Sequence, residues 1–304
     1  MAMDGFSLSN AIKYSNLDHE IIHGDAISAL ADLASDSVDL IFADPPYNIG
    51  KDFDGLKENW DEDSFLQWMF TCIDECVRVL KPRGTFYLMN STENMPFLDM
   101  YCRKKLHIKS RIVWAYDSSG VQAKKYFGSM YEPMLMMTGS EKGYTFNSDS
   151  VLVEAKTGSQ RKLIDYRKTP PQPYNTKKVP GNVWNIPRVR FKMPEYENHP
   201  TQKPEQFLER IVLASSNTGD TVLDPFSGSF TTSAVAQKHN RRSIGIEINS
   251  EYVKMGIRRL DLPSNFTCEE LAKVKKRKTK NESKRSRDSK KDECQMALIQ
   301  EAEL

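Results

Sequence analysis

The stretch VDLIFAD at residues 38–44 decides the fold, and Pro45 and Pro46 follow it directly. It is a short run of mostly apolar residues that ends in a carboxylate. Runs of this length bounded by strand-breaking residues are typical of buried β-strands, and proline cannot donate a hydrogen bond to a sheet ladder. We therefore predict a buried strand that places Asp44 at its carboxyl end.

Helices and strands alternate beyond this strand. Apolar residues recur at three- and four-residue steps between positions 65 and 80, as in an amphipathic helix, and the sequence KPRG at 81–84 is a helix stop signal. The next strand is predicted at 85–90, and two further strand candidates lie at 108–116 and 131–138.

The same alternation returns toward the carboxyl end. The predicted elements are, in order, a helix at 204–216 with proline in its first turn, a strand at 221–224, a Gly/Ser loop, a helix at 231–238, a strand at 243–249 and a helix at 250–260. Strands that alternate with helices of this length predict an α/β protein with a mostly parallel, doubly wound sheet.

Composition is that of a folded domain. The chain has 304 residues, of which 39% are hydrophobic and 28% charged, enough for one α/β domain of fair size. Its five cysteines have no metal-ligand spacing, so we interpret them as small hydrophobic residues in a reducing compartment. No stretch approaches the roughly eighteen apolar residues of a membrane span. We expect a cytoplasmic protein with no membrane partner.

Charge is unevenly placed along the chain. Residues 273–291 contain 11 Lys and Arg against Glu282 and Asp288, a net charge of +9, although the whole chain carries only +2. A segment so basic and so poor in apolar residues cannot bury enough surface to fold alone. We expect a disordered tail, which is either a solvated end or a cationic arm that binds DNA phosphates.

The sequence DPPY at 44–47 can act on an exocyclic amino group. Such a nitrogen is a poor nucleophile because its lone pair is delocalised into the ring. A carboxylate and a backbone carbonyl that accept both N–H hydrogens stabilise the positive charge that forms during attack. Asp44 supplies the carboxylate and Pro45 the carbonyl, while Pro46 keeps that carbonyl fixed. Tyr47 offers a flat face on which an extruded base can stack.

A second strand end, DPFSGSF at 224–230, is a candidate cofactor loop. Gly228 and its small neighbours allow the backbone to approach a ligand, and Asp224 can pair with an ammonium group. Glu247, about 20 residues later, is placed to bind ribose hydroxyls. The GxGxxG and GxxxxGKS/T patterns are absent, which disfavours NAD and ATP. A tight packing turn with no ligand remains the alternative for this loop.

Four motifs together resemble a known family. DPPYNIG at 44–50, HPTQKP at 199–204, DPFSGSFTT at 224–232 and GIEINSEY at 245–252 are similar to the motifs of the β group of DNA amino-methyltransferases. The resemblance covers about residues 20–262. It implies a Rossmann-like, S-adenosylmethionine-dependent methyltransferase fold with circularly permuted motif order and an inserted target-recognition lobe.

The resemblance assigns roles to residues that match these motifs. Asp44, Pro45, Pro46 and Tyr47 would form the catalytic motif. The residues implied for binding of S-adenosylmethionine are Asp25, near the cofactor adenine; Thr201, Gln202 and Lys203, around its methionine end; Asp224, Phe226 and Gly228, along the pocket; and Glu247, on the ribose. No metal site is expected.

Two positions in these motifs bear on cofactor binding and on catalysis. The family usually has a second glycine where this chain has Phe230, so a bulky side chain there could narrow the approach of the loop to the cofactor. His199 suggests a general base, but the attacking amine can lose its proton after transfer and needs none. We therefore leave His199 out of the catalytic set.

The resemblance also divides the chain. It implies an N-terminal extension at 1–20, a catalytic half at 21–116, a target-recognition region at 117–198, a cofactor-binding half at 199–262 and the basic tail at 263–304. The expected reaction is methyl transfer to N6 of a flipped-out adenine in a short, palindromic site of double-stranded DNA, with ATGCAT as the target that the resemblance suggests. The sequence leaves the oligomeric state open, with a homodimer as one option.

Other functions remain as alternatives. Methylation of cytosine N4 uses the same acceptor chemistry, although that group commonly has Ser at the position of Asp44. Protein-glutamine methyltransferases have Asn there and place the cofactor loop first, so both features disagree. A catalytically inactive DNA-binding protein is the third alternative, and the intact motifs disfavour it.

Overall fold

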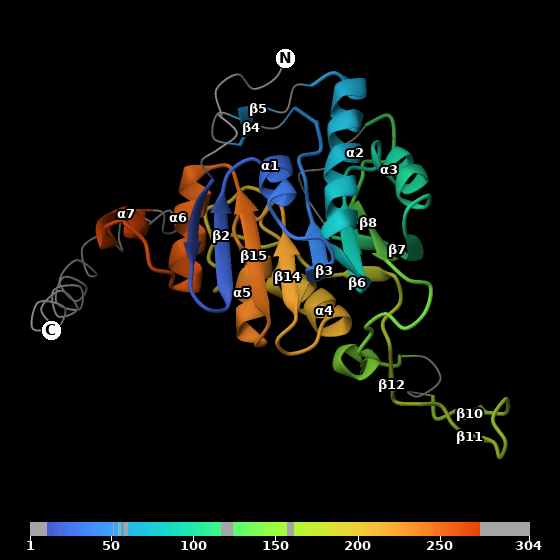
Figure 1. Cartoon of the computed structure of the whole chain (residues 1–304). Coiled ribbons are helices and arrows are strands. Elements are labelled where there is room, and N and C mark those ends of the chain that lie inside the picture. Colours follow the sequence, from blue (N-terminus) through green and yellow to red (C-terminus); the bar gives the residue numbers. More distant parts are fainter. Residues whose placement is uncertain are drawn as a thin grey trace, which may run out of the picture.

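The computed structural model describes residues 11–50, 52–53, 56–57, 60–116, 124–156 and 161–273 (Figure 1). Its centre is a nine-stranded sheet, whose strands lie in the order β1 (Ile12–Ser15), β2 (His19–His23), β15 (Arg242–Glu247), β14 (Thr221–Asp224), β3 (Val38–Ala43), β6 (Leu80–Met89), β8 (Tyr131–Thr138), β7 (His107–Ala115) and β13 (Val183–Asn185). The neighbours from β2 to β6 are all parallel. The strand β8 runs antiparallel to both of its neighbours. The predicted mostly parallel sheet is confirmed.

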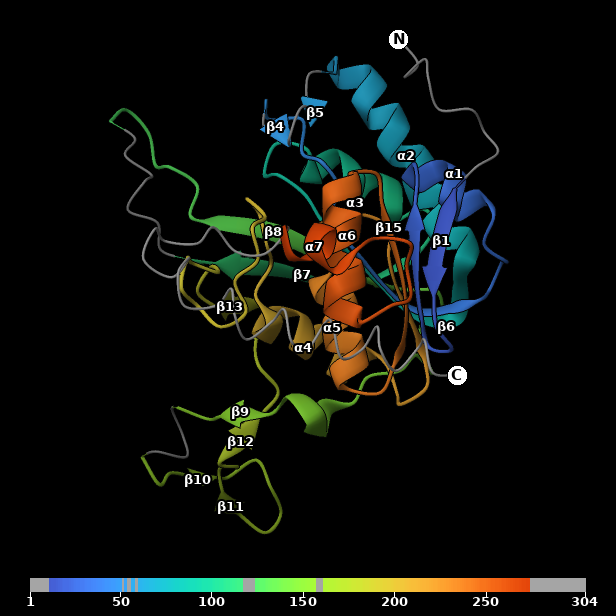
Figure 2. The ribbon, with the colours of Figure 1, turned by 90° about the vertical axis from the view of Figure 1, so that its left-hand side faces the viewer.

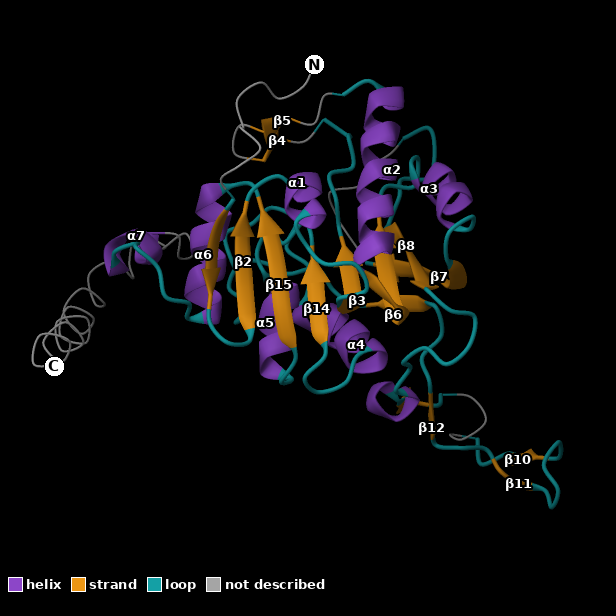
Figure 3. Ribbon diagram, viewed as in Figure 1, coloured by secondary structure: helices purple, strands orange, loops and turns teal. Residues whose placement is uncertain are grey.

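Helices cover both faces of this sheet. One face packs against α1 (Ala26–Ala31), α2 (Glu62–Val79) and α3 (Met95–Cys102), and the other against α4 (Glu205–Ser215), α5 (Thr231–Lys238) and α6 (Ser250–Leu260). In Figure 3 the arrowheads of β2, β15, β14 and β3 point to the same edge of the sheet. The loops that follow these strands therefore meet at one edge.

The stretch that decides the fold is buried on both faces, as predicted. Within β3, Ile41 and Ala43 belong to the core under α1–α3, while Leu40 and Phe42 belong to the core under α4 and α5. All four side chains are at most 2% exposed. Successive side chains of a strand point to opposite faces, so an unbroken apolar run is what a central strand requires.

The predicted helices agree closely with the structure, and strand limits differ by a few residues. The helix α2 begins after Asp61, whose carboxylate accepts the Ser64 N–H at 2.9 Å, and ends at Val79. The strand β6 begins at Leu80 rather than at residue 85. The KPRG sequence lies within this strand, at the point where the pairing register with β3 shifts from Val38–Leu80 to Leu40–Thr85.

Among its described residues, the predicted target-recognition region at 117–198 contains little regular structure apart from β8. After β8 the described elements are the 3-10 turn η1 (Ser148–Val151), β9 (Val153–Glu154), β10 (Ile164–Asp165), β11 (Gln172–Pro173), β12 (Lys177–Lys178) and β13. The β9–β12 and β10–β11 pairs form an arm that projects from the body of the molecule in two perpendicular views (Figures 1 and 2). We call the described residues 153–156 and 161–178 the arm. A further short pair, β4 (Asp52–Phe53) with β5 (Leu56–Lys57), precedes α2.

Both ends of the main domain extend further than expected. The strand β1 and the start of β2 fall within the predicted N-terminal extension. The predicted tail starts at residue 263, but the helix α7 (Cys268–Lys273) follows, and Phe266 and Leu271 pack against the α6 core. The basic segment from residue 274 onward, expected to be disordered, lies outside the described residues.

Two composition-based expectations can be compared with the structure. Cys72, Cys76 and Cys102 are free and buried, in line with their interpretation as hydrophobic residues. Within the described part of the chain, none of the helices is long and apolar enough to cross a membrane.

Candidate active site

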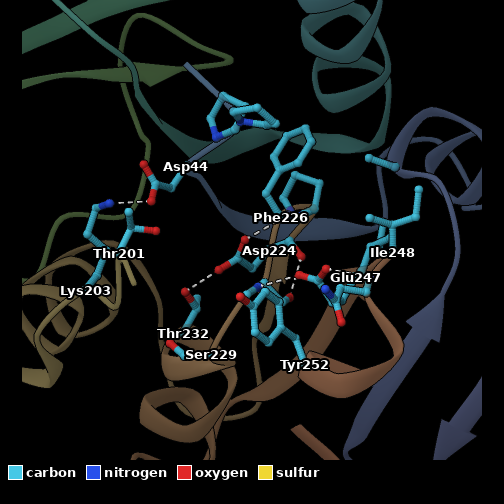
Figure 4. Close-up of a pocket in the computed structure, with 18 of the residues that line it drawn as sticks. Asp44, Thr201, Lys203, Asp224, Phe226, Ser229, Thr232, Glu247, Ile248 and Tyr252 are labelled. Atoms are coloured by element: carbon cyan, nitrogen blue, oxygen red, sulfur yellow. Dashed lines mark hydrogen bonds and ion pairs between the residues drawn. The ribbon is translucent and has the colours of Figure 1, made fainter. Parts of the chain in front are cut away.

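A cavity of about 430 Å³ opens at the edge of the sheet where the parallel strands end. Four of its acidic residues lie at or just after the ends of β2, β3, β14 and β15, namely Asp25, Asp44, Asp224 and Glu247. In Figure 4, Asp44 and Lys203 lie at one end of the cavity, Asp224 in the middle and Glu247 at the other end. All twelve residues that the sequence singles out line this cavity: Asp25, Asp44, Pro45, Pro46, Tyr47, Thr201, Gln202, Lys203, Asp224, Phe226, Gly228 and Glu247.

Both oxygens of Asp44 are hydrogen-bonded. The Tyr47 hydroxyl donates to Oδ1 at 2.6 Å, and the Lys203 ammonium forms an ion pair with Oδ2. Asp44 and Lys203 are 159 residues apart in the chain. Their side chains are only 17% and 8% exposed. The Asp44 carboxylate is therefore held in one orientation at the carboxyl end of β3 rather than free to rotate.

A glutamate that sequence reasoning missed completes this group. Glu132, on β8, accepts a hydrogen bond from the Tyr47 hydroxyl at 3.2 Å and lies 3.5 Å from the Lys203 ammonium. Its other oxygen accepts the Tyr116 hydroxyl at 3.2 Å. The only sequence signal was a carboxylate in the otherwise apolar strand at 131–138.

The charges in this group support one another. Burial opposes the charge on Lys203, but Asp44 and Glu132 outweigh it and raise the pKa of Lys203 above its usual value. Burial likewise opposes ionisation of Glu132, yet Lys203 and the two tyrosine hydroxyls lower its pKa. The pKa of Tyr47 is raised by burial first and by the two carboxylates second. These shifts keep Glu132 ionised, Lys203 protonated, and Tyr47 and Tyr116 neutral at neutral pH.

The second predicted loop follows β14 and places a buried carboxylate in the cavity. Asp224 is 3% exposed, accepts the Phe226 N–H at 3.0 Å and is hydrogen-bonded by the Thr232 hydroxyl. Burial raises the pKa of Asp224 to about 7, and these hydrogen bonds oppose the shift only in part. A buried carboxylate of this kind gains stability from a cationic ligand.

Glu247 ends β15 on the neighbouring strand. Its carboxylate accepts the N–H groups of Gly228 at 2.7 Å and Asn249 at 2.8 Å. Burial raises its pKa, and these backbone donors reduce the shift. The side chain thus ties the loop after β14 to the loop after β15. Since a carboxylate has more acceptor sites than these two donors fill, it can also accept ligand hydroxyls.

Gly228 is required by the ring that packs on it. Its φ is +48°, and a Cβ at this position would lie 2.8 Å from Nε2 of His199. His199 packs edge-on against Tyr252 with ring centroids 4.5 Å apart. Burial, with Lys203 second, lowers the pKa of His199 to about 3, so the ring is neutral at physiological pH. Its position supports a packing role.

Phe230 points away from the cavity. The residue has φ +56° and is fully buried, with its ring in the core formed by Ile21 and α6. A Cβ at Gly245 or at Gly256 would lie 2.7 or 2.5 Å from that ring. Two glycines elsewhere in the chain therefore make room for the side chain. The expectation that it narrows the cofactor loop is not borne out by its direction.

Aromatic side chains form one wall of the cavity. Trp60, Trp68 and Phe226 all line it, with centroid distances of 5.2 Å between the two tryptophans and 5.7 Å between Trp68 and Phe226. Asn48 holds Trp60 through two backbone hydrogen bonds of 2.8 and 3.0 Å. Asn48, which follows Tyr47 in the chain, thus connects the DPPY motif directly to the aromatic wall. Sequence reasoning did not identify these tryptophans.

The remaining predicted residues also have structural partners. Asp25 caps α1, accepting Ser28 N–H at 3.0 Å. Gln202 donates to the Glu195 carbonyl at 2.6 Å and accepts the Glu197 N–H at 2.7 Å. The backbone N–H of Thr201 donates to the His199 ring at 3.3 Å. Gln202 and Thr201 thus hold the 195–203 segment over the cavity.

The cavity fits S-adenosylmethionine on the chemistry of its walls. Asp224 is a buried carboxylate suited to an ammonium group, and Glu247 retains acceptor sites suited to ribose hydroxyls. The aromatic wall offers flat apolar surfaces to a purine. Within the described residues, no cluster of His, Cys, Asp and Glu could hold a metal ion.

Comparison with known proteins gives consistent results. A family model of the DNA methylases matches residues 38–258. The DNA adenine methyltransferase YhdJ of Escherichia coli (strain K12) is 69% identical over 280 residues, which cover 92% of this chain and 95% of YhdJ. The type II methyltransferase M.HpaI of Haemophilus parainfluenzae is 37% identical over 251 residues, covering 82% of this chain and 76% of M.HpaI.

Solved structures share the fold at lower identity. The cytosine-N4-specific PvuII DNA methyltransferase superposes with a TM-score of 0.65 at 17% identity, covering 87% of this chain and 95% of that chain. The complex of M1.HpyAVI with S-adenosylmethionine gives a TM-score of 0.56 at 22% identity, covering 80% of this chain and all of that chain. At these identities the likeness concerns the fold, which is Rossmann-like.

Proposed function

Because the chain belongs to the DNA methylase family, we propose that it transfers a methyl group from S-adenosylmethionine to N6 of adenine in double-stranded DNA. The observation that carries this proposal is that Asp44, Asp224 and Glu247 all line the same cavity. An amino group held at Asp44 then faces a ligand held by Asp224 and Glu247. The 69% identity to an adenine methyltransferase supports adenine over cytosine.

The acceptor end suits an amino group on a flipped-out base. Asp44 Oδ1 accepts one N6 hydrogen and the Pro45 carbonyl accepts the other, which directs the nitrogen lone pair toward the cofactor end. The Tyr47 ring provides the surface on which the base stacks. As the N6–carbon bond forms, the amine becomes positively charged. It then loses one proton toward Asp44 or water.

The cofactor end is assigned to residues of the two loops. S-adenosylmethionine, when bound, supplies an electrophilic methyl group on a sulfonium, which leaves as a neutral thioether. Asp224 pairs with the methionine ammonium, Glu247 accepts the ribose hydroxyls, and Asp25 lies near the adenine. Phe226 and Gly228 form part of the cavity wall along the cofactor. The side of the cavity opposite this wall is closed by Thr201, Gln202 and Lys203.

Target recognition is assigned to residues 117–198. We assign base contacts and phosphate contacts to different parts of this region. Arg188 lies over the Tyr116 ring, 5.0 Å from its centroid, and Tyr116 binds Glu132 in the cavity wall. This contact supports assigning Arg188 to bases next to the extruded adenine. The described residues of the arm are mostly exposed and carry a basic excess, and none of them lines the cavity, so the arm suits phosphate contacts.

Three further features belong to this proposal. The target is a short palindrome, with ATGCAT as the first sequence to test. Such symmetry is compatible with a homodimer that places one cavity on each strand. Action on chromosomal DNA places the enzyme in the bacterial cytoplasm at the nucleoid.

Transfer of labelled methyl to unmethylated duplex DNA, followed by digestion to nucleosides, tests the reaction. Label in N6-methyladenine is the expected result, and the labelled positions can then be mapped against ATGCAT. Label in N4-methylcytosine would overturn the substrate while leaving the fold and cofactor. No label with bound cofactor would overturn the DNA substrate.

A further inference from the structure

The hydrogen bonds of Asp44 raise a question about how adenine enters. Its Oδ2 is held by Lys203, and its Oδ1 is the acceptor of the Tyr47 hydroxyl at 2.6 Å. The proposed reaction needs Oδ1 for an adenine N–H. A carboxylate oxygen has two lone pairs, so Oδ1 can accept both hydrogens, but each donor that it accepts weakens its bond to the other. In this sense the hydroxyl competes with the substrate for the same oxygen.

A second acceptor for this hydroxyl is already in place. The Tyr47 oxygen lies 2.6 Å from Asp44 Oδ1 and 3.2 Å from Glu132 Oε2. A phenol has one hydrogen, so it donates a full hydrogen bond to one of two acceptors at a time. Rotation of that hydrogen about the C–O bond transfers the donation from Asp44 to Glu132 without moving either side chain.

We propose that Glu132 is a positioning residue for the methyl transfer: it accepts the Tyr47 hydroxyl when adenine arrives, and so releases Asp44 Oδ1 for the N6 amino group. This inference rests on the proposed adenine methylation. Glu132 touches neither reacting atom and acts through Tyr47 and Lys203.

The surroundings of Glu132 fit this role. Its Oε1 is held by Tyr116 at 3.2 Å, and Lys203 lies 3.5 Å from Oε2, so Oε2 faces the Tyr47 hydroxyl in a fixed direction. Hydrogen bonds to an ionised acceptor are about twice as strong as neutral ones. A carboxylate at this position can therefore compete with Asp44 for the phenol hydrogen, whereas a neutral side chain cannot do so equally.

Lys203 makes the exchange possible without loss of alignment. It bridges Asp44 Oδ2 and Glu132 Oε2, so both carboxylates keep their directions while the hydrogen changes partner. The backbone of Glu132 pairs with Trp114 inside the β7–β8 ladder, which holds its place whatever the side chain. A substitution of Glu132 should thus change the hydrogen-bond exchange more than the fold.

The test compares Glu132→Gln with the wild type in the labelled-methyl assay, measuring kcat and the KM values for DNA and cofactor. The expected result is a fall in kcat of about 10-fold or more. This is less than the roughly 100-fold or greater loss typical of removing a group that acts directly on the transition state, because Glu132 acts through Tyr47. Both KM values should stay near those of the wild type. Glu141→Gln is the matched control, because Glu141 is exposed and lies just after the same strand.

A second substitution distinguishes a positioning role of Glu132 from a purely structural role. If Glu132 serves to draw the hydroxyl away from Asp44, removing that hydroxyl makes Glu132 less necessary. Adding Tyr47→Phe to Glu132→Gln should then raise kcat again by about threefold or more, a coupling usual for residues that touch each other. A purely structural role predicts that the two losses multiply.

The outcomes are distinguishable from failure of the proposed function. Unchanged kcat in Glu132→Gln, or a double variant no faster than the single one, overturns the inference while the wild type still labels N6-methyladenine. Wild-type enzyme that labels no adenine overturns the proposed function itself. Should Glu132→Gln fold poorly, Glu132→Asp, which keeps the charge, gives the same comparison with Tyr47→Phe.

Discussion

In the proposed reaction the chemistry depends on Asp44, whose carboxylate would accept an amino hydrogen as positive charge develops. We expect Asp44→Ala to lower methyl transfer by about 100-fold or more, since it removes a group that acts mainly in the transition state. Cofactor and DNA affinity should change little. Labelled transfer combined with equilibrium binding measures both, and retained turnover would refute the assigned role.

If Asp224 pairs with the cofactor ammonium as proposed, cofactor binding should depend on pH. Burial raises its pKa to about 7, so the folded protein keeps a proton there at pH values where the unfolded chain has lost it. The free energy of unfolding of the free protein therefore falls as pH rises from about 4 to about 7. A bound ammonium favours the ionised carboxylate. We expect the Kd of S-adenosylmethionine to decrease as pH rises toward 7 and to level off above it.

Titration calorimetry between about pH 5.5 and 8.5 measures this dependence, which approaches tenfold per pH unit well below the pKa. Asp224→Asn should bind more weakly and lose this part of the dependence. Glu247→Gln is the control for the second raised carboxyl pKa. A wild-type Kd that is constant over this range would contradict the pairing of Asp224 with the ammonium.

At the scale of elements, α6 packs closely against the β14–α5 loop because Gly256 has no side chain. Replacing glycine by alanine in a helix normally stabilises it by about 1 kcal/mol. Here the new Cβ would lie 2.5 Å from the Phe230 ring, and such overpacking costs about 1–3 kcal/mol. We expect Gly256→Ala to lower the free energy of unfolding, measured by urea denaturation.

The matched variant for this packing is Gly256→Ala combined with Phe230→Leu. A smaller side chain at 230 leaves room for the methyl group, so the two destabilising effects should be less than additive. Additive effects would show that the ring and Gly256 do not constrain each other. Cofactor affinity should persist in both variants, because the Phe230 ring lies in the core formed by Ile21 and α6.

At the scale of the whole molecule, we expect DNA affinity to depend on basic segments outside the cavity. Removing residues 274–304 leaves α7 intact and deletes most of the basic tail. If the tail binds phosphates, affinity falls and the slope of log K against log salt flattens by about 0.9 for each phosphate that the protein no longer neutralises. Fluorescence anisotropy at several salt concentrations measures it, and an unchanged slope would leave the tail as a solvated end.

The arm provides the comparison for the tail. Lys177 and Lys178 form β12 and are exposed. Replacing both by Gln should weaken binding to specific and unrelated duplexes alike, as expected of side chains that bind phosphates. Arg188→Ala should instead reduce discrimination between target and unrelated sequences. The opposite pattern would exchange the tasks assigned to these two regions.

The sequence alone determined most strands of the central sheet and the helices α2, α4, α5 and α6, but it did not predict β1, β13, α1 or α3. Apolar periodicity, capping residues and proline are local signals, so the limits of α5, α6 and β14 agree with those predicted. It also placed the polar side chains at strand ends. Since parallel strands share one carboxyl edge, Asp44, Asp224 and Glu247 had to meet there once the sheet was parallel.

Only the tertiary structure decided which of these groups touch. Tyr47 and Glu132 are 85 residues apart, and they meet because β8 inserts antiparallel between β6 and β7, an order that no local pattern encodes. The direction of Phe230 likewise depends on glycines of β15 and α6. Local chemistry fixes the elements, whereas the meeting of distant residues depends on sheet order and packing, which involve the whole chain at once.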